Sequence, residues 1–394
     1  MPKFSVLLPT RNGGAYLRTC INSVLGQRNS DIELVVSDNA NTDETVAVLK
    51  EFAGDNRLRI VRHSTVKSVT DNWMSALEAS SGEYILTIGD DDYVLPGYFQ
   101  EMDAALRRHQ WPECVAYNGY SYVFPNSMKG AEVSYFADPH FHFDAALKEG
   151  DLSAPYRRKL VSDMFRFEVR YPLNVQLTTF SRTAMRRIPA PFFRQPFPDH
   201  FAINSLLLTA STFVYLPAQL VVIGLSPKSF GHFAYGGNQV VGMTYLGSTS
   251  DFEDRLEGSE LLNSMHAWLG LLLETYPADL RGIEIDRSAY VRRQVAFSLL
   301  QLRQGAISAG ELLGRSRKLR ATDWLRLIGT VGDTAAWRRI PRLTAFAGGD
   351  RPRQHWHGLR PLPEVSDIGE FAAWAARRGR AGELTRSAAG SSCP

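Results

Sequence analysis

The sequence has few cysteines and no apolar run long enough to cross a membrane. Its only cysteines among 394 residues are Cys20, Cys114 and Cys393. Three scattered cysteines are too few for a disulfide framework or a zinc site, so we interpret them as free thiols in a reducing compartment. The longest apolar run, residues 213–225, is interrupted by Pro217. It predicts paired strands rather than the roughly 20 apolar residues of a membrane span.

The sequence also lacks a strong net charge and a dinucleotide-binding fingerprint. The formal net charge is +3, which does not indicate a nucleic-acid partner, and we predict none. No G-x-G-x-x-G motif follows the first predicted strand, which argues against a dinucleotide-dependent oxidoreductase. Because the chain enters that strand almost at once, we expect no signal peptide. We therefore predict a cytoplasmic location.

What the sequence does have is an alternation of strand-like and helix-like segments over its first 90 residues. Apolar, β-branched runs predict strands at residues 4–10, 32–36, 58–61 and 84–88, and helical spacing predicts helices at 16–25, 44–52 and 71–80. Strands that alternate with helices predict an α/β fold, with a mainly parallel sheet flanked by helices.

Three consecutive aspartates, Asp90, Asp91 and Asp92, follow the fourth predicted strand. Adjacent carboxylates repel one another, and a hard divalent cation such as Mg²⁺ or Mn²⁺ would neutralise them. The alternative is an acidic turn that only ends the strand. Ligands of parallel sheets bind beyond the carboxyl ends of the strands. We therefore expect Thr10 and Asp38, at the ends of the first two strands, to converge on the same site.

These segments resemble the catalytic domain of glycosyltransferase family 2. The motifs that carry the resemblance lie at residues 5–12, 35–43, 72–77, 82–85 and 89–97. The resemblance covers residues 3–125 well and fades towards 235. It implies a Rossmann-like GT-A fold and a nucleotide-diphosphate-sugar donor with Mn²⁺ or Mg²⁺ as cofactor. It also implies inverting transfer to a hydroxyl or amine of an acceptor, whether a glycan, a lipid-linked molecule or a small molecule.

The same resemblance implies roles for individual residues. The expected nucleotide-sugar-binding residues are Pro9, Thr10, Arg11, Asn12, Asp38, Asn72, Asp90, Asp91 and Lys228. The D-x-D motif of the family is shifted here, because Gly89 stands where the motif usually begins with aspartate. We expect Asp91 or Asp92 to coordinate the metal, and Asp90 to face the ribose or the metal.

Two later segments resemble catalytic positions of the family. Asp199, in the sequence Pro198-Asp199-His200, opens a predicted helix where the family places its general base. The alternatives are that Asp199 only caps the helix, or that His200 is the base. Lys228 and His232 lie in a polar loop and are candidates to meet the diphosphate or the metal. The alternative for both is an ordinary surface loop.

We predict a GT-A catalytic domain at residues 1–240, with a nucleotide-sugar half at 1–110 and an acceptor half at 111–240. A helical region at 251–376 and a disordered tail at 377–394 follow. Residues 315–360 are rich in arginine and contain only three acids. This segment fits either peripheral contact with the inner face of a membrane or a solvated helical surface. The sequence leaves open whether the protein forms a homo-oligomer.

Two other functions fit an α/β sheet with an acidic cluster. A nucleotidyltransferase would need a basic, glycine-rich phosphate loop after the first strand, and the loop here has a single arginine. A non-catalytic sugar-binding protein on the same fold is the second alternative, since a fold does not guarantee activity.

Overall fold

The computed structural model describes residues 1–28, 31–127, 132–229, 251–303, 305–329 and 359–378. Its strands are β1 (Phe4–Thr10), β2 (Ile32–Asp38), β3 (Leu58–Arg62), β4 (Tyr84–Thr87), β5 (Tyr93–Val94), β6 (Cys114–Val123), β7 (Tyr135–Ala137), β8 (Gly150–Asp151), β9 (Thr178–Ser181), β10 (Phe213–Leu225) and β11 (Arg360–Pro361). Its helices are α1 (Gly14–Leu25), α2 (Thr45–Glu51), α3 (Val69–Ala79), α4 (Tyr98–Arg108), α5 (Ala154–Met164), η1 (Val175–Leu177), α6 (Arg182–Arg187), α7 (Pro198–Thr209), α10 (Glu260–Thr275), α11 (Arg287–Arg303), α12 (Ala309–Ser316) and α13 (Ala321–Gly329).

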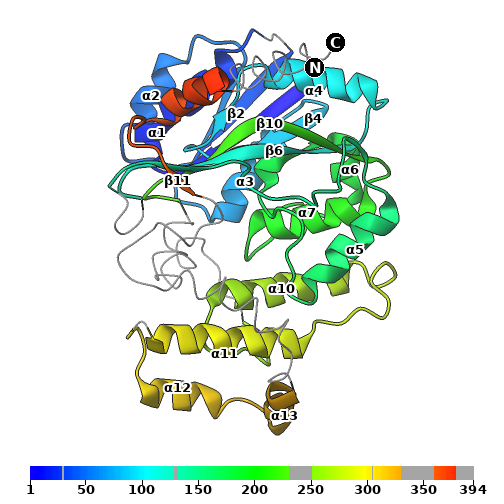
Figure 1. Ribbon diagram of the computed structural model, residues 1–394. Coiled ribbons are helices and arrows are strands. Elements are labelled where there is room, and N and C mark those ends of the chain that lie inside the picture. Colours follow the sequence, from blue (N-terminus) through cyan, green and yellow to red (C-terminus); the bar gives the residue numbers. More distant parts are fainter. Residues whose placement is uncertain (29–30, 128–131, 230–250, 304, 330–358, 379–394) are drawn as a thin grey trace, which may run out of the picture.

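All strands belong to one sheet with the order β11-β7-β6-β9-β4-β1-β2-β3, and β10 joins it beside β6. The predicted α/β class, with helices flanking the sheet and a helical region after it, is confirmed (Figure 1). The four strands β3, β2, β1 and β4 are parallel, as the alternating pattern predicts.

Beyond β4 the sheet is mostly antiparallel. Strand β9 lies between β4 and β6 and is antiparallel to both. Residues 213–225 form the single strand β10 rather than the predicted pair of strands, and the register shifts between Leu216 and Val221. Pro217 lies in this irregularity. Because proline has no backbone N–H to donate, it is tolerated at a bulge, where the chain need not break.

The two faces of the sheet bury separate apolar clusters, because neighbouring residues of a strand point to opposite sides. Leu7 and Val35 face α3, α5 and α7, whereas Val6 and Val36 face α1, α2 and α4. All four side chains are fully buried. The sequence runs are continuously apolar rather than alternating because both faces are covered.

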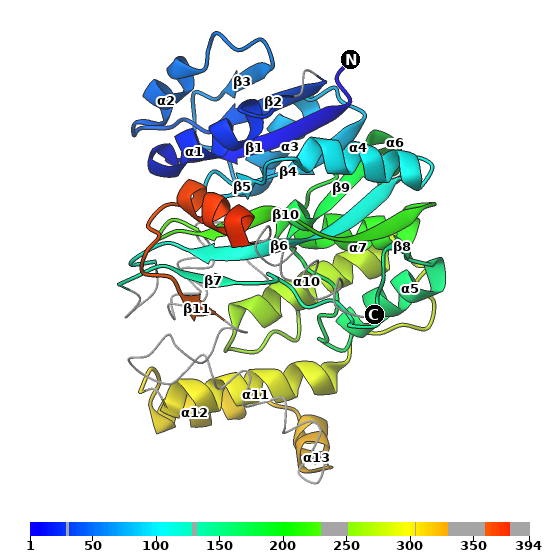
Figure 2. The same ribbon diagram turned by 45° about the horizontal axis from the view of Figure 1, so that its top comes forward.

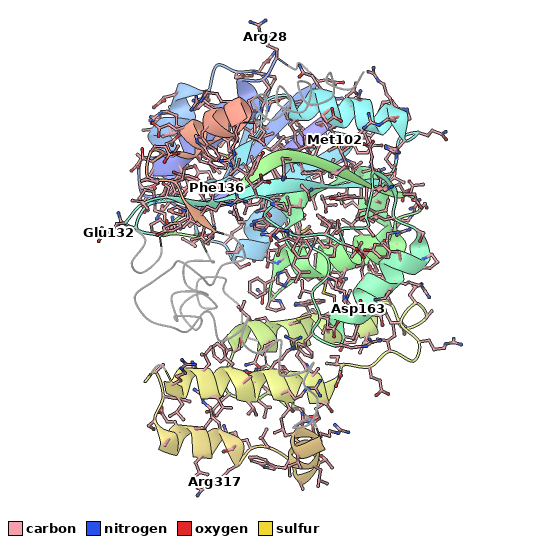
Figure 3. The ribbon with its side chains drawn as sticks, viewed as in Figure 1. Arg28, Met102, Glu132, Phe136, Asp163 and Arg317 are labelled. Carbon is pink, nitrogen blue, oxygen red and sulfur yellow. The ribbon has the colours of Figure 1, made fainter. Side chains whose placement is uncertain are left out.

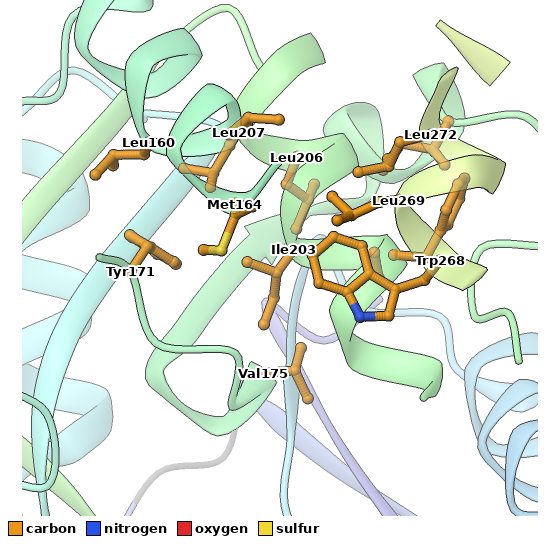
Figure 4. Close-up of a cluster of buried hydrophobic side chains, with 14 of the residues drawn as sticks. Leu160, Met164, Tyr171, Val175, Ile203, Leu206, Leu207, Trp268, Leu269 and Leu272 are labelled. Carbon is orange, nitrogen blue, oxygen red and sulfur yellow. The ribbon is translucent and has the colours of Figure 1, made fainter. Parts of the chain in front are cut away.

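Helix α10 shares the first of these clusters with the helices of the sheet domain. Trp268 and Leu269 of α10 pack against Ile203 of α7, and Met164 of α5 lies in the same cluster (Figure 4). The indole of Trp268 is fully buried. The helical region after residue 251 therefore begins as a layer on the sheet domain and is not joined to it only by a linker.

Helices α11, α12 and α13 continue away from the sheet beyond α10 (Figures 1 and 2). Arg287 of α11 pairs with the buried carboxylate of Asp323 in α13, at 2.8 Å between Nη2 and Oδ2. Within the described ranges, no helix combines the length and the apolar character that a membrane span needs.

The chain then returns to the sheet. Strand β11 pairs with β7, and residues 368–378 form a helix that lies beside α1 (Figure 1). Phe371 is fully buried there and its ring lies 5.3 Å from that of Tyr122 and 5.8 Å from that of Phe136. The limits predicted for the domains stay a prediction, but residues 359–378 pack on the sheet rather than with α10–α13. Residues 379–394 of the predicted disordered tail lie outside the described part of the chain.

We expect Phe371→Ala to lower the free energy of unfolding by about 3–5 kcal/mol, because it leaves a cavity among aromatic rings. Chemical denaturation of the full chain measures this loss. Ala373→Ser, an exposed position in the same helix, is the control and should change stability by less than about 0.5 kcal/mol. Equal stability of the two variants would show that the returning helix does not contribute to the stability of the folded domain.

Candidate active site

The carboxyl ends of β1, β2 and β4 meet at one edge of the sheet. Thr10 and Asp38 are register partners in the parallel β1–β2 pair. The Thr10 hydroxyl donates a hydrogen bond of 2.6 Å to Asp90 Oδ2, just beyond β4. The residues expected to converge therefore lie together, and Thr10 is joined to Asp90 by a direct hydrogen bond.

Asp92 is held by three hydrogen bonds from the protein. Its Oδ2 accepts from the Gly89 backbone N–H at 2.6 Å and from Gln176 Nε2 at 3.1 Å. Its Oδ1 accepts from the Gly224 backbone N–H at 2.9 Å. The residue is 2% exposed. Both oxygens therefore accept hydrogen bonds from the fold, and Asp92 anchors the acidic turn to η1 and β10.

Asp90 and Asp91 accept hydrogen bonds from the ends of β1 and β10, and the Arg11 backbone and the Ser226 hydroxyl add to these. Asp90 Oδ2 accepts from Thr10, and Asp91 Oδ2 accepts from the Ser226 backbone N–H at 3.2 Å. Two glycines, Gly13 and Gly224, lie very close to this acidic turn. A Cβ atom on Gly13 would lie 2.0 Å from Asp90 Oδ2, and one on Gly224 would lie 1.8 Å from the Asp91 carbonyl oxygen. A side chain at Gly224 would therefore collide with the backbone, and one at Gly13 would displace the Asp90 carboxylate.

Burial and mutual repulsion raise the pKa values of these carboxyl groups. The pKa of Asp90 and that of Asp91 are raised to about 7, in each case by burial first and by the neighbouring aspartate second. Burial raises the pKa of Asp92 to about 6 against the opposing effect of its hydrogen bonds. Three ionised carboxylates are thus unfavourable here without added positive charge.

The chemistry of this cluster fits a divalent cation shared with a ligand. Among the residues that the structure describes, no three His, Cys, Asp or Glu side chains come together as a complete metal site. Mg²⁺ and Mn²⁺ are commonly held by one or two carboxylates, with phosphate oxygens and water completing the shell. Asp91 and Asp90 can supply those two carboxylates, whereas His232, the third predicted ligand, lies outside the described residues.

The loop after β1 is tied to the loop after β2. The guanidinium of Arg11 donates to the Ala40 carbonyl oxygen, and the Thr42 backbone N–H donates to Asn12 Oδ1 at 2.9 Å. Asn12 and Ala40 both have left-handed backbones, with φ of 55° and 51°. That conformation is unusual for alanine and marks a constrained backbone at this edge. Pro9 is buried within β1, shortly before this loop.

Asp38 and Asn72 are both buried rather than exposed in an open binding loop. Asp38 is 4% exposed, and its Oδ1 accepts from Asn41 Nδ2 at 2.6 Å. Arg62 Nε lies 3.9 Å from its other oxygen. Asn72 is also 4% exposed and accepts from the Ser37 hydroxyl at 2.7 Å. Asn72 thus supports the end of β2 from α3, which favours an indirect role at the site.

Lys228 reaches back over the first loop from the end of β10. Its ammonium group donates to the Asn12 carbonyl oxygen and lies 3.6 Å from Asp43 Oδ2. Its positive charge also lowers the pKa of Asp90 against the larger effect of burial. Lys228 therefore places a cation beside the acidic cluster, on the side expected to face a diphosphate.

Asp199 lies in the first turn of α7. The helix is capped by Phe197, with Pro198 at its first position, so Asp199 is not the N-cap residue. Burial raises the pKa of Asp199 to about 7, although backbone N–H groups, including that of Val175, act in the opposite direction. His200 Nε2 lies 3.9 Å from Asp199 Oδ1.

The imidazole of His200 lies between two aromatic rings and is 19% exposed. It stacks on Phe197 at 4.5 Å and meets Trp268 of α10 edge-on at 5.7 Å. Its Nδ1 is buried and has no hydrogen-bond partner among the described residues. This burial lowers the pKa of His200 to about 3. At neutral pH the imidazole is therefore a weak base.

The residues that link the acidic cluster to Asp199 were not predicted from the sequence. Gln176 of η1 donates to Asp92, and Val175 beside it donates its backbone N–H to Asp199. One short 3₁₀ turn thus spans the two carboxylate sites. Tyr16 of α1 was also missed, and Asp91 and Asp90 raise the pKa of its phenol after burial, the larger cause. Neither Gln176 nor Tyr16 lies in a recognisable motif.

Residues 5–165 match the profile of the family described as Glycosyl transferase family 2. The match contains β2, β3 and β4, all of β1 except its first residue, and the acidic cluster. This part of the chain belongs to glycosyltransferase family 2.

Curated relatives agree with this membership over shorter stretches. The chain is 30% identical over 130 residues to the GalNAc(5)-diNAcBac-PP-undecaprenol beta-1,3-glucosyltransferase of Campylobacter jejuni, covering 32% of this chain and 39% of the relative. It is 35% identical over 92 residues to the PGL/p-HBAD biosynthesis glycosyltransferase of Mycobacterium bovis, covering 23% and 36%. The chain thus spans well under two thirds of the length of these relatives.

Solved structures resemble the chain more loosely. A fragment of TarS from S. aureus has a TM-score of 0.44 at 14% identity, covering 93% of this chain and 98% of the fragment. The mannosyltransferase PcManGT from Pyrobaculum calidifontis, in complex with GDP-Man and Mn²⁺, has a TM-score of 0.40 at 14% identity, covering 86% and 87%.

The hydrogen bonds predict different effects for Asp92→Asn and Asp91→Asn. Asp92→Asn should lower the free energy of unfolding by about 1–3 kcal/mol, because its amide cannot accept from all three donors. Asp91→Asn should leave stability unchanged or raise it, because it removes a like charge. Thermal and chemical denaturation without added metal compare the two. A destabilised Asp91→Asn beside an unaffected Asp92→Asn would reverse the assignment of anchor and metal ligand.

Proposed function

We propose that this family 2 domain is an inverting, metal-dependent glycosyltransferase that takes a nucleotide-diphosphate-sugar donor. The observation that carries the proposal is the placement of two carboxylate sites on either side of η1. The buried cluster at residues 90–92 can receive a cation and a diphosphate, and the carboxylate of Asp199 has a pKa near neutrality. An acceptor with a hydroxyl or amine group would enter on the Asp199 side.

The donor would bind along the carboxyl ends of β1, β2 and β4. Thr10, Arg11 and Asn12 border this edge on one side, and Asp38 lies at its base. Lys228 provides positive charge against the leaving diphosphate. A divalent ion bound by Asp91 and Asp90 would neutralise further negative charge on that leaving group.

Asp199 would remove the proton from the acceptor as the new bond forms. A base works best when its pKa lies near the working pH, and the carboxyl of Asp199 meets that condition while the imidazole of His200 does not. Fixed positions of donor and acceptor favour a single displacement, in which the attacking oxygen or nitrogen approaches the anomeric carbon opposite the diphosphate. That geometry inverts the anomeric configuration.

Metal dependence can be tested through donor binding as well as turnover. We expect a nucleoside diphosphate to raise the melting temperature of the full chain with Mn²⁺ or Mg²⁺ but little after chelation. Donor hydrolysis should show the same dependence. Asp91→Asn should lose the metal-dependent shift, whereas the exposed control Asp71→Asn should keep it. Full activity after exhaustive chelation would contradict a metal at the cluster, and binding without any turnover would support a non-catalytic sugar-binding protein.

Asp199→Asn should reduce turnover on the order of 10²–10⁴ while nucleotide binding survives. In the unchanged protein at saturating Mn²⁺, kcat/KM should fall as the pH drops below about 7, because protonation of Asp199 removes the base. The variant should lose the part of this fall that is due to Asp199. The part due to Asp90 and Asp91, whose pKa values are also raised to about 7, should shift with the Mn²⁺ concentration. His200→Ala is the matched comparison and should keep the whole fall of kcat/KM at low pH. A normal rate for Asp199→Asn with a large loss for His200→Ala would transfer the role to the histidine, and a retained anomeric configuration would exclude the single displacement.

A further inference from the structure

The exposed apolar side chains of this protein are concentrated at one end. Of the nine large hydrophobic residues that are exposed in the described chain, five belong to α11, α12 and α13. They are Leu299, Leu313, Trp324, Leu325 and Ile328. These helices lie beyond α10 at the end of the molecule farthest from the parallel half of the sheet (Figures 1 and 2).

Helix α13 divides into an inner and an outer face. Asp323 is buried against Arg287. Leu327 packs on the apolar cluster that contains Leu7 and Trp268. Trp324, Leu325 and Ile328 face outward and are 46%, 69% and 66% exposed. Ile328 lies four residues after Trp324 and three after Leu325, so it neighbours both on the helix surface. The inner contacts therefore fix α13 on the protein while its most apolar surface stays in water.

Basic residues lie among these apolar side chains. Residues 287–329 contain nine basic and two acidic residues. Arg315, Lys318 and Arg320 pair with Glu257 or Asp254 of the preceding segment, whereas the described residues show no ion pair of Arg317 or Arg326. One of the two acids, Asp323, has a fully buried carboxylate paired with Arg287. Arg317 and Arg326 are both exposed, and Figure 3 shows Arg317 at the end of the molecule opposite Arg28.

Apolar side chains set among arginines match the interface of an anionic bilayer. The apolar groups can enter the boundary between headgroups and acyl chains, and each arginine contributes attraction to acidic lipid headgroups. A water-soluble protein partner with an acidic surface would not require the exposed Trp324 and Ile328 to be so apolar. An uncharged apolar partner would not require the arginines.

We propose that the outer face of α13, together with α12 and the exposed part of α11, is a docking surface for an anionic lipid bilayer. This distal surface is defined by Leu313, Trp324, Leu325 and Ile328 with Arg317 and Arg326. It lies outside the proposed catalytic machinery. If the proposed transferase function also holds, docking would bring the enzyme to acceptors carried in a membrane.

Vesicle sedimentation with the full-length chain tests this surface. The probes are vesicles of phosphatidylcholine alone and vesicles that also contain phosphatidylglycerol. We expect binding to the anionic vesicles at low salt, weaker binding as salt rises, and little binding to the neutral ones. Failure to bind anionic vesicles at low salt would overturn the proposal. Equal binding to both kinds of vesicle would overturn the part assigned to the arginines.

Paired variants test whether vesicle binding depends on the distal surface or on exposed side chains anywhere on the protein. Leu325→Ser with Ile328→Ser should weaken partitioning tenfold or more. Arg317→Ala with Arg326→Ala should weaken it by roughly fivefold per residue, the equivalent of about 1 kcal/mol each. Trp324→Ser is compared with Trp111→Ser, since both indoles are 46% exposed. Arg28→Ala, at the opposite end, is the control for charge.

Self-association of the chain through the same helices is the competing outcome. Sedimentation velocity without lipid tests whether the chain associates with a second copy of itself. An oligomer that is disrupted by Leu325→Ser with Ile328→Ser, without vesicle binding by the unchanged protein, would replace the membrane with a self-interface. Equal losses of vesicle binding for Trp111→Ser and Trp324→Ser would overturn the assigned surface. Donor hydrolysis in solution should be unchanged in all these variants, so loss of docking and loss of catalysis are separate readouts.

Discussion

The burial of three adjacent carboxylates is the constraint around which this domain is arranged. Burial is the largest cause of the raised pKa of each aspartate, and hydrogen-bond donors from other parts of the chain act in the opposite direction. Those donors come from β1, from η1 and from the end of β10. Three segments far apart in the sequence are thereby held at one edge of the sheet. The repulsion that remains between the carboxylates would be relieved by added positive charge.

The same arrangement links the acidic cluster to the candidate base. The η1 turn donates to Asp92 through Gln176 and to Asp199 through the backbone of Val175. Helix α10 closes the other side of α7, where Trp268 meets His200. The region after residue 251 therefore shapes the environment of the proposed catalytic residues, even though its own sequence contains no catalytic motif.

The first 90 residues could be interpreted closely from sequence, because each parallel strand is a short apolar run between turn residues and each neighbouring helix has an apolar stripe. The positions of Thr10, Asp38 and Asp90 followed from one rule about the ends of parallel strands. Residues 213–225 were misinterpreted as two strands, since a proline usually ends a strand, but here a bulge accommodates Pro217 within β10. The return of residues 359–378 to the sheet carries no local signal, because it depends on aromatic contacts with distant residues.

The sequence by itself determined the α/β class, the order of the N-terminal elements and the identity of the acidic cluster, since these depend on local periodicity and on residue type. Only the tertiary structure distinguished the carboxylates within the cluster. Both oxygens of Asp92 accept from Gly89, Gln176 and Gly224, while Oδ2 of Asp90 accepts from Thr10 and Oδ2 of Asp91 from Ser226. It also separated Asp199 from His200, because the burial of each side chain by packed helices moves the two pKa values in opposite directions. Burial and hydrogen-bond partners come from residues far away in the chain, so no local pattern can report them.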